Sequence, residues 1–500
     1  MKFFLTLHPM RKILSIIVSV ASVIFVGCVD FTKTASHADA QNTLVVIHTN
    51  DTHSHIDPIA ATGMGGVMRR MELIDSIRAV QPNVLLIDAG DIVQGTLYFH
   101  LYKGEVEQKV LNALGYDIQI LGNHEFDNGM DALKTMLSQA QTTLLSSNYE
   151  FADSLLDAKF QSYVVKEYGK HRVGIFALNL NPEGMIAEGN YDGVTFLPWK
   201  SVVNQTVDKL RNQLHCDYVI AVNHIGYNAP ENSPLFGDVQ VAEQTQGIDL
   251  IVGAHSHTRL DSAVIVHNVI GNPVAIVQTG RNGEFLGETT INLKTKTVNE
   301  KLIPVIPSHG NIKNDQLEAL IAPYRSGIDS LYNIELAFLK GSEPLSKGNG
   351  YALQNFAADF IWAKANELAP DIIGALANSG SLRTTWNPGK ISQGDVIDMM
   401  PFHNKIVVLD IKGADLIEAQ QIMRQRNDCA VAGIGGSESI NPNKTYRIAT
   451  VDYLANGGDY MTPLTRAKQV AQSKKLVFED LINFLKQNPE INPNNTKRLK

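Results

Sequence analysis

The chain has 500 residues, of which 44% are hydrophobic and 19% are charged, and its formal net charge is −8. This length exceeds one ordinary hydrophobic core and predicts two large domains, and the composition is globular rather than disordered or fibrous. The negative charge argues against a general nucleic-acid binder, which usually presents a basic surface. It does not exclude a small anionic substrate, because bound metal ions supply their own positive charge.

The first 28 residues have the features of an export signal. Arg11 and Lys12 precede an apolar run over residues 13–26, which is short for a membrane span and typical of a signal peptide. Residues 25–28, Phe-Val-Gly-Cys, are similar to a bacterial lipobox. We therefore expect a signal peptide over residues 1–28, with Cys28 as the lipidated first residue of the mature chain.

Two alternatives remain open at this end. Met10 is an alternative start, because the positive segment begins directly after it. Cleavage after the small-x-small site at residues 38–40 would release a soluble protein, but this site lies far beyond the apolar run. Either way the chain is expected to leave the cytoplasm. The favoured localisation is a membrane-anchored lipoprotein facing the periplasm or the cell surface, with residues 29–42 as a tether and no other membrane contact.

Residues 43–305 are expected to form a layered α/β domain. Short β-branched apolar runs predict buried strands, and amphipathic stretches between several of them predict helices. The expected strands are Leu44–Ile47, Val84–Ile87, Ile118–Leu121, Val173–Leu178, Tyr218–Val222, Leu250–Val252 and Val274–Val277. The expected helices are Val67–Val80, Glu105–Leu114, Met130–Gln139 and Val202–Leu214.

The organisation changes near residue 305, where a segment rich in Pro and Gly precedes a predicted helix over Asp315–Tyr332. Residues 306–333 are expected to be a linker helix, and residues 334–490 a second, smaller α/β domain. Its expected elements are helix Tyr351–Leu368, strand Ile406–Ile411, helix Ala414–Arg426, strand Tyr446–Val451 and a terminal helix near Leu476–Lys486. The last eleven residues are polar, and we expect them to fray. The three cysteines, Cys28, Cys216 and Cys429, make no disulfide framework.

Polar residues follow five of the predicted strands, and in open α/β sheets this carboxyl edge is where ligands bind. The candidate metal ligands, in chain order, are Asp51, His53, Asp91, Asn123, His224, His255 and His257. Each short motif alone is weak, since most are ordinary loop or turn residues. Their joint occurrence, each after an apolar run, is far more specific.

The residue types fit a particular chemistry. Two cations about 3.5–4 Å apart can hold the attacking and ester oxygens of a phosphate ester and lower the pKa of a shared water. Mixed imidazole and carboxylate ligands suit Zn, Mn or Fe better than Ca. Asp51 and His53 are two residues apart, so the alternation of a strand predicts both side chains on one side, and the same holds for His255 and His257. His48 lies inside the first strand and is expected to pack or to form hydrogen bonds.

These motifs resemble two family patterns. The segments 47–53, 90–91, 122–127 and 253–257 are similar to the calcineurin-like metallophosphoesterases. The segments 378–383, 394–395, 401–402 and 454–459 are similar to the C-terminal domain of the 5′-nucleotidase family, which includes bacterial periplasmic UDP-sugar hydrolases and animal ecto-5′-nucleotidases. The resemblance covers roughly residues 43–490. It implies a four-layer α/β/β/α metallophosphoesterase domain followed by a smaller α/β domain that binds the nucleoside part of the substrate.

The resemblance also implies roles. One divalent metal ion would be held by Asp51, His53, Asp91 and His257, and a second by Asp91, Asn123, His224 and His255, with Asp91 bridging. His124 would be the catalytic histidine, and Asp127 would orient it and raise its basicity. A hydroxide would attack phosphorus in line, and the metals and His124 would assist departure of the nucleoside 5′-oxygen. The expected substrate-binding residues are Arg383, Asn378 and Tyr460, with a surface arginine as the alternative for Arg383.

The sequence departs from the family where the base is usually stacked between two aromatic rings. Residues 427–434 form a shortened segment without an aromatic residue, the second ring position is displaced at Tyr460, and His403 stands where the family favours Gly. A stacked base contributes roughly 1–3 kcal/mol per ring by analogy with single-strand binding. The reaction class is therefore better supported than the substrate.

The predicted function is hydrolysis of nucleoside 5′-monophosphates, with UDP-sugars or 2′,3′-cyclic nucleotides as further substrates. The expected partner is this small molecule, or another phosphate ester, and not a nucleic acid. One alternative is a metallophosphoesterase with a non-nucleotide substrate. Another is a non-catalytic surface binding lipoprotein, against which the full ligand set with His124 and Asp127 argues.

Overall fold

The computed structural model describes residues 41–499 apart from residue 61 and residues 230–234, 307–313, 348–349, 427 and 429. The expected signal peptide, the lipidation site at Cys28, the alternative start and cleavage sites and nearly all of the tether lie outside the described residues, as does Cys429. Within the described part of the chain, no helix combines the length and apolar character needed to cross a membrane.

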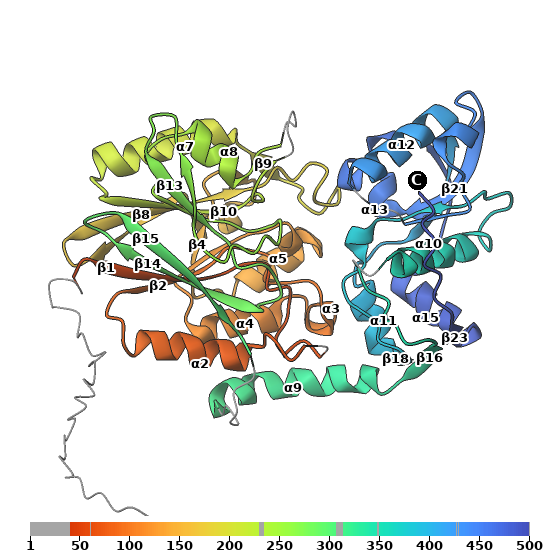
Figure 1. Ribbon diagram of the computed structural model, residues 1–500, viewed down its shortest axis with the longest axis horizontal. Coiled ribbons are helices and arrows are strands. Elements are labelled where there is room, and N and C mark those ends of the chain that lie inside the picture. Colours follow the sequence, from red (N-terminus) through yellow and green to blue (C-terminus); the bar gives the residue numbers. More distant parts are fainter. Residues whose placement is uncertain are drawn as a thin grey trace, which may run out of the picture.

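Two β-sheets form the centre of the N-terminal domain (Figure 1). The seven-stranded sheet has the order β15 (Thr297–Pro304), β14 (Phe285–Asn292), β1 (Thr43–Thr49), β2 (Val84–Asp88), β3 (Ile118–Ile120), β4 (Thr143–Leu145) and β6 (Phe160–Gln161). The six-stranded sheet has the order β12 (Val264–His267), β13 (Pro273–Val277), β11 (Leu250–Val252), β10 (Tyr218–His224), β8 (His171–Asn179) and β7 (Tyr163–Tyr168). All seven predicted strands are present, because each is a run of buried apolar residues.

The two sheets pack face to face, and helices cover their outer faces. Val46 and Ile87 of the larger sheet share a buried cluster with Val222 and Val252 of the smaller one. The helices on the side of the larger sheet are α2 (Val67–Arg78), α3 (Leu97–Tyr102), α4 (Glu105–Leu114) and α5 (Gly129–Leu137). Those on the other side are α7 (Trp199–Asp208) and α8 (Asp238–Gln244). The expected four-layer α/β/β/α arrangement is confirmed (Figure 1).

Strand order brings the ligand-bearing loops to one edge. Strands β1, β2 and β3 are adjacent and parallel in the larger sheet. Strands β10 and β11 are adjacent and parallel in the smaller sheet. The carboxyl ends of these five strands therefore open toward the same region between the two sheets. Smaller elements complete the domain: β5 (Tyr149–Phe151) pairs with β9 (Val194–Phe196), and α6 is a single turn (Ser154–Asp157).

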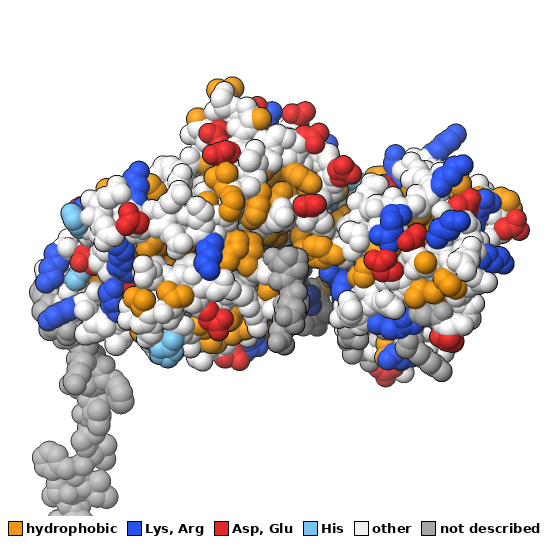
Figure 2. All heavy atoms as spheres, turned by 90° about the horizontal axis from the view of Figure 1, so that it is seen from above, with side chains coloured by type: hydrophobic (Ala, Val, Ile, Leu, Met, Phe, Trp, Pro, Cys, Tyr) orange, Lys and Arg blue, Asp and Glu red, His pale blue; other side chains and the backbone are white. Residues whose placement is uncertain are grey.

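Helix α9 (Asp315–Tyr332) links the two domains, as predicted for its described part. It packs on the N-terminal domain through the buried side chain of Ile321 and an ion pair between Arg325 and Asp57 at 2.8 Å. At its far end, the hydroxyl of Tyr332 donates a hydrogen bond to Asp398 of the C-terminal domain. The two domains form separate lobes when seen from above, with basic and acidic side chains interspersed on the visible face of each (Figure 2).

The C-terminal domain contains a five-stranded and a three-stranded sheet. Their orders are β20 (Val431–Ala432), β17 (Ala375–Leu376), β21 (Thr445–Val451), β19 (Ile406–Lys412) and β22 (Lys468–Gln472), and β18 (Gly389–Ser392), β16 (Glu335–Leu339) and β23 (Glu490–Ile491). The helices are α10 (Ala352–Ala365), α11 (Gln393–Met399), α12 (Gly413–Gln425), α13 (Asp452–Ala455), α14 (Thr462–Thr465) and α15 (Val477–Gln487). The three helices and two strands expected here are all present.

The expectation that the last residues fray is wrong for the described residues up to 499. Strand β23 pairs in parallel with β16, and the side-chain amide of Asn355 donates to the backbone carbonyls of Asn494 and Thr496 at 2.7 and 2.8 Å. Arg498 forms an ion pair with Asp359 at 2.6 Å, and Leu499 is only 3% exposed. Polar composition suggested a solvated tail, but the partners that hold it lie far away in the sequence.

This packing predicts a stability effect. We expect Leu499→Ala to lower the free energy of unfolding by about 2 kcal/mol, because a buried leucine loses its packing contacts. Denaturant unfolding measures the change. Thr496→Ala removes an exposed side chain of the same tail and serves as the control, with an expected change below about 0.5 kcal/mol. Equal stability of Leu499→Ala and the unaltered protein would contradict the packed tail.

Candidate active site

The candidate ligands gather into two groups at the edge where the five strands end. Asp51, His53 and His257 form one group, and Asp91, His224 and His255 form the other. Within each group the potential ligand atoms all lie within 4.8 Å of one another. They differ from the two sets that the resemblance implies in two ways: Asp91 is not in the first group, and Asn123, which carries an amide, is not in the second. A third group joins Asp91 to His53 and His124.

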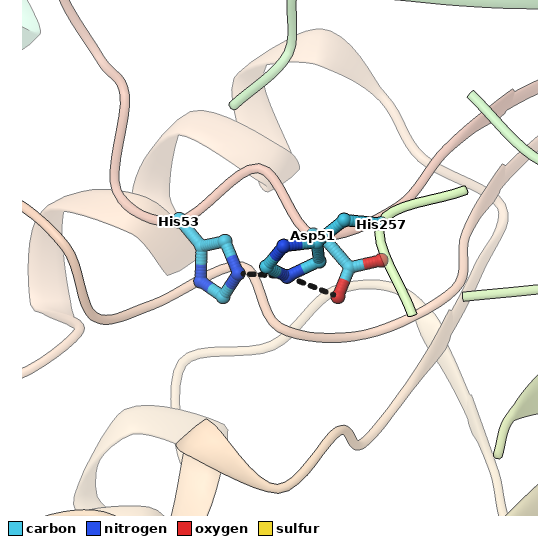
Figure 3. Close-up of side chains that lie close together, drawn as sticks. All are labelled: Asp51, His53 and His257. Carbon is cyan, nitrogen blue, oxygen red and sulfur yellow. Dashed lines mark hydrogen bonds and ion pairs between the residues drawn. The ribbon is translucent and has the colours of Figure 1, made fainter. Parts of the chain in front are cut away.

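In the first group, three side chains point toward one another from two loops (Figure 3). Nε2 of His53 lies 2.9 Å from Nε2 of His257, and this nitrogen of His257 lies 3.5 Å from Oδ1 of Asp51. Burial and then the positive charge of Arg383 hold the pKa of His53 well below its usual value. A neutral imidazole is the form that binds a metal ion.

In the second group, Nε2 of His224 lies 3.2 Å from Oδ2 of Asp91, and Nδ1 of His255 lies 2.9 Å from Oδ1 of Asn123. The other ring nitrogen of His224 lies 2.8 Å from the carbonyl oxygen of Ala89. A hydrogen bond donated there fixes the ring and leaves Nε2 facing the group, as in many metal-binding histidines. Burial and then the charge of His224 lower the pKa of His255 to about 3.

The donor set fits divalent cations. The side chains of Asp51 and Asp91 are buried, and burying a carboxylate is costly unless a cation or hydrogen-bond donors compensate it. Imidazole and carboxylate together are ligands for Zn, Mn or Fe rather than for Ca. His53 and His255, whose pKa values are lowered, supply lone pairs without adding positive charge. Burial disfavours the charged form of His224, but Asp91 outweighs it and raises the pKa of His224 to about 10, so a bound metal ion would replace that proton. The residues present can therefore hold metal ions in both groups.

Strand alternation was predicted to place the two side chains of Asp-x-His, and those of His-x-His, on one side, and this prediction is wrong. β1 ends at Thr49 and β11 at Val252, so neither Asp-x-His nor His-x-His lies in a strand. Instead, five candidate ligands have left-handed backbone conformations: Asp51 (φ 49°), His53 (φ 48°), Asp91 (φ 56°), His255 (φ 74°) and His257 (φ 55°). Each such conformation is uncommon in a non-glycine residue and costs of order 1–3 kcal/mol. The surrounding fold holds these loops in a strained geometry that turns both side chains of each pair into the site.

Two glycines allow the close approach of the loops. A Cβ atom on Gly122 would lie 2.2 Å from Oδ1 of Asp91, and one on Gly90 would lie 2.8 Å from Nδ1 of His224. Both distances are far inside van der Waals contact. Any side chain at either position would displace a candidate ligand.

His124 and Asp127 form a pair beside Asp91. Nδ1 of His124 lies 2.8 Å from Oδ2 of Asp127, and the backbone N–H of His124 donates to Oδ1 of Asp91 at 2.9 Å. A short 3₁₀ helix, His124–Phe126, sets the spacing of the pair. Burial lowers the pKa of His124, but Asp127 and then Asp91 outweigh it, and the net effect is a raised pKa. Nε2 of His124 lies 4.0 Å from Oδ2 of Asp91.

Of the three expected substrate-binding residues, only Arg383 reaches the candidate ligands. Its Nη2 lies 3.3 Å from Nε2 of His53, and its guanidinium lies 5.7 Å from the centre of the Phe402 ring. Asn378 instead donates to Oδ2 of Asp459 at 2.8 Å. Tyr460 packs against the N-terminal domain, where a Cβ atom on Gly184 would lie 3.1 Å from its ring.

No role was predicted for Glu125, although it lies in the same motif as Asn123 and His124. Its carboxylate is buried and accepts hydrogen bonds from the backbone N–H groups of Asp91 at 3.2 Å, Ile92 at 2.9 Å and Gly122 at 2.5 Å. It thereby ties the loop after β2 to the loop after β3. Its position directly after a candidate catalytic histidine is the sequence signal that could have identified Glu125 as a residue of the site.

Asn50 is a second residue without an assigned role. Its amide nitrogen donates to Oδ2 of Asp51 at 2.6 Å, and its amide oxygen accepts from the backbone N–H of Thr279 at 2.8 Å.

His48 behaves as predicted: it is buried in β1, with Nε2 3.3 Å from Oε1 of Glu300.

Comparison with known proteins places this geometry in a family. The model for the calcineurin-like phosphoesterases matches residues 44–259, and that for the 5′-nucleotidase C-terminal domain matches residues 339–434. The chain belongs to the 5′-nucleotidase family. It is therefore a metallophosphoesterase, a hydrolase of phosphate esters whose domain type implies divalent metal ions.

Individual relatives in the family cover most of the chain. The trifunctional nucleotide phosphoesterase protein of Bacillus subtilis is 29% identical over 85% of this chain, which spans only 32% of that relative's length. The human 5′-nucleotidase is 26% identical, with 83% of each chain covered. The crystal structure of a 5′-nucleotidase precursor from Thermus thermophilus has a TM-score of 0.80 at 26% identity, covering 91% of this chain and 98% of that one.

The contacts of Glu125 predict an effect on metal binding. Glu125→Gln replaces one acceptor oxygen with an amide group that faces backbone N–H donors, so the loop carrying Asp91 loses its support. We expect metal affinity to fall about 10–100-fold, as is usual when groups that orient metal ligands are altered. Titration calorimetry with Mn²⁺ measures this change.

The matched control is Glu150→Gln, which alters an exposed glutamate on β5 and should leave the affinity unchanged. Circular dichroism establishes that both variants are folded. Identical Mn²⁺ affinity for Glu125→Gln and the unaltered protein would show that Glu125 does not support the site.

Proposed function

We propose that this chain is a 5′-nucleotidase that releases phosphate from nucleoside 5′-monophosphates at two divalent metal ions, Zn, Mn or a similar metal. UDP-sugars and 2′,3′-cyclic nucleotides are further candidate substrates. The observation that carries the proposal is the meeting of three features at one place: two ligand groups, the His124–Asp127 pair, and Arg383 reaching in from the C-terminal domain. Relatives named 5′-nucleotidase that match over most of their length support the same substrate class.

In this proposal Asp51, His53, Asp91 and His257 hold one ion, and Asp91, Asn123, His224 and His255 hold the other. Bound divalent ions would neutralise phosphoryl charge and lower the pKa of an attacking water. Sharing of Asp91 is supported by its place in two groups of potential ligands, one with His224 and one with His53.

The chain's own residues complete the reaction. The planar guanidinium of Arg383 suits the non-bridging oxygens of the phosphoryl group. The carboxylate of Asp127 accepts a hydrogen bond from the Nδ1–H of His124, which fixes the orientation of the ring and favours its protonated form. Nε2 of His124 then donates a proton to the 5′-oxygen as it leaves, a general-acid role that commonly contributes about 10²–10⁴-fold.

A second candidate is a metallophosphoesterase with a non-nucleotide substrate. It is favoured by the lack of an aromatic residue in the segment 427–434 and by the packing of Tyr460 against the loop at Gly184. Both observations weaken the case for a stacked base.

A substrate panel separates the two candidates. We expect phosphate release from AMP and UMP, abolished by EDTA and restored by Mn²⁺ or Zn²⁺, with UDP-glucose, 2′,3′-cyclic AMP and p-nitrophenyl phosphate as comparison substrates. Turnover of p-nitrophenyl phosphate alone would favour the non-nucleotide substrate. No EDTA-sensitive turnover on any of the five would sink the proposal.

His124→Ala is expected to lower kcat on AMP by about 10²–10⁴-fold, because the leaving oxygen loses its proton donor, while bound metal is retained. Phosphate release and metal content measured on the same sample separate these effects. His267→Ala, which alters an exposed histidine on β12, is the matched control. Full activity in His124→Ala would remove this residue from the mechanism.

The location outside the cytoplasm is also a proposal, supported by the lipobox-like segment ending at Cys28. We expect metabolic labelling with palmitate to modify the full chain expressed in a bacterium, and Cys28→Ala to abolish the label. A label that persists in Cys28→Ala, or none in the unaltered chain, would contradict the lipid anchor.

A further inference from the structure

Two adjacent apolar side chains are exposed at the tip of the hairpin that joins β12 to β13. Val269 is 60% exposed and Ile270 is 62% exposed, and Ile265 on β12 is 50% exposed. Among the residues that the structure describes, no other two consecutive large apolar side chains are both exposed. Single exposed apolar residues are ordinary on a protein surface, whereas a cluster of them marks a contact with another apolar surface.

The turn itself does not require these apolar side chains. Oδ1 of Asn268 accepts hydrogen bonds from the backbone N–H groups of Ile270 at 3.1 Å and Asn272 at 3.0 Å. Gly271 supplies the left-handed conformation that closes the turn (φ 82°). Asn and Gly are the residues that build such turns. The buried side chain of Asn268 thus holds the tip in one shape, with the side chains of Val269 and Ile270 exposed to solvent.

The tip lies at the end of the N-terminal domain where the described chain begins. Strands β8, β10, β11 and β13 are parallel neighbours, and their register aligns Ile175 of β8 with Ala275 of β13. These residues lie four positions after His171 and Gly271, so the tip is level with the start of β8. Neighbouring strands are about 4.8 Å apart, so three strand spacings, about 15 Å, separate the tip from that start.

The first described residues lie beside the start of β8. A Cβ atom on Gly169, in the turn before β8, would lie 3.0 Å from the carbonyl oxygen of Gln41. Nε2 of His171, the first residue of β8, lies 2.8 Å from Oδ1 of Asn42. Cys28 precedes Gln41 by 13 residues, which span at most about 45 Å. A lipid on Cys28 would therefore hold the domain by the end that carries the tip.

The candidate metal ligands lie at the opposite end of the same strands. His224 ends β10, and His255 and His257 follow the carboxyl end of β11. When the tip faces a bilayer, this edge faces away from the lipid, and a charged substrate can reach it from water. Contact of the tip with lipid is therefore compatible with access to the active site.

We propose that Val269 and Ile270 insert into the lipid surface to which Cys28 is anchored, as a second contact that fixes the orientation of the enzyme. The inference rests on the proposed lipid anchor and not on the proposed substrate, and it adds a contact to the lipid that was expected to meet the membrane alone. Two side chains bury too little apolar area to bind a membrane firmly by themselves. The anchor supplies the high local concentration at which so weak a contact is occupied.

Fluorescence quenching by lipid tests this contact in the mature lipoprotein, reconstituted into vesicles of phosphatidylethanolamine and phosphatidylglycerol with or without brominated acyl chains. Ile270→Trp places a fluorophore at the tip, and the signal of the unaltered protein, which has 3 Trp residues, is subtracted. We expect brominated lipid to lower the added fluorescence about twofold, because an interfacial apolar surface reaches about 5–10 Å into the boundary between head groups and acyl chains.

Phe338→Trp is the matched control. It places the same fluorophore on β16 of the C-terminal domain, at a position that is 48% exposed, and brominated lipid should leave its fluorescence unchanged. Circular dichroism establishes that both variants are folded. Equal quenching at positions 270 and 338 would show that the tip is not the preferred contact and would overturn the proposal.

Mass spectrometry of the N-terminal peptide separates failure of the tip contact from failure of the anchor. Lipid on Cys28 without quenching of Ile270→Trp would overturn the tip contact and leave the anchor in place, whereas a Cys28 without lipid would overturn both. These readouts do not depend on phosphate release, so a lack of turnover on AMP would contradict the nucleotidase proposal alone.

Sedimentation of the lipoprotein in detergent tests the other possible occupant of the tip, a second copy of the chain. We expect Ile270→Ser to leave the oligomeric state unchanged. An oligomer that Ile270→Ser dissociates would assign the tip to a contact between copies and overturn the lipid contact.

Discussion

The buried carboxylate of Asp91 belongs to two groups of potential ligands, one with His224 and His255 and one with His53 and His124. It lies 3.2 Å from His224 and accepts a hydrogen bond from the backbone N–H of His124. The position of Asp91 depends on Gly122, because any Cβ atom there would collide with Oδ1 of Asp91. It also depends on Glu125, whose carboxylate accepts a hydrogen bond from the backbone N–H of Asp91. A buried charge is costly unless it is compensated, so Asp91 requires both these contacts and the cations that would bind beside it. In the proposed mechanism, the hydrolysis of the phosphate ester depends on this arrangement.

The backbone conformations around Asp91 are energetically unfavourable, and the rest of the fold stabilises them. Left-handed backbone at Asp51, His53 and His257 is unfavourable, and it persists because β11 and all of β1 after Thr43 are buried and fix the start of each loop. Strain of this kind concentrates at functional sites because it presents ligands without further rearrangement. Bound metal ions would stabilise the folded state further, because the unfolded chain does not hold their ligands together.

The sequence predicted the parts of this site that depend on local pattern. Buried apolar runs such as Val84–Ile87 are recognisable as strands, and polar residues at their ends mark the ligand edge. The left-handed conformations were not predictable, because they are uncommon even for Asp and His and the tertiary contacts impose them. Glu125 was missed because its role lies in hydrogen bonds to the backbone of another loop, and the folded tail was missed because Asn355 and Asp359 hold it from far away in the sequence.

We propose that Asp91 would contribute to the binding of two divalent ions. Crystals grown with Mn²⁺ test it directly through the anomalous scattering of the metal. We expect two peaks about 3.5–4 Å apart, one on each side of the Asp91 carboxylate, with Asp51, His53 and His257 around one of them. A single peak, or two peaks of which neither contacts Asp91, would contradict it.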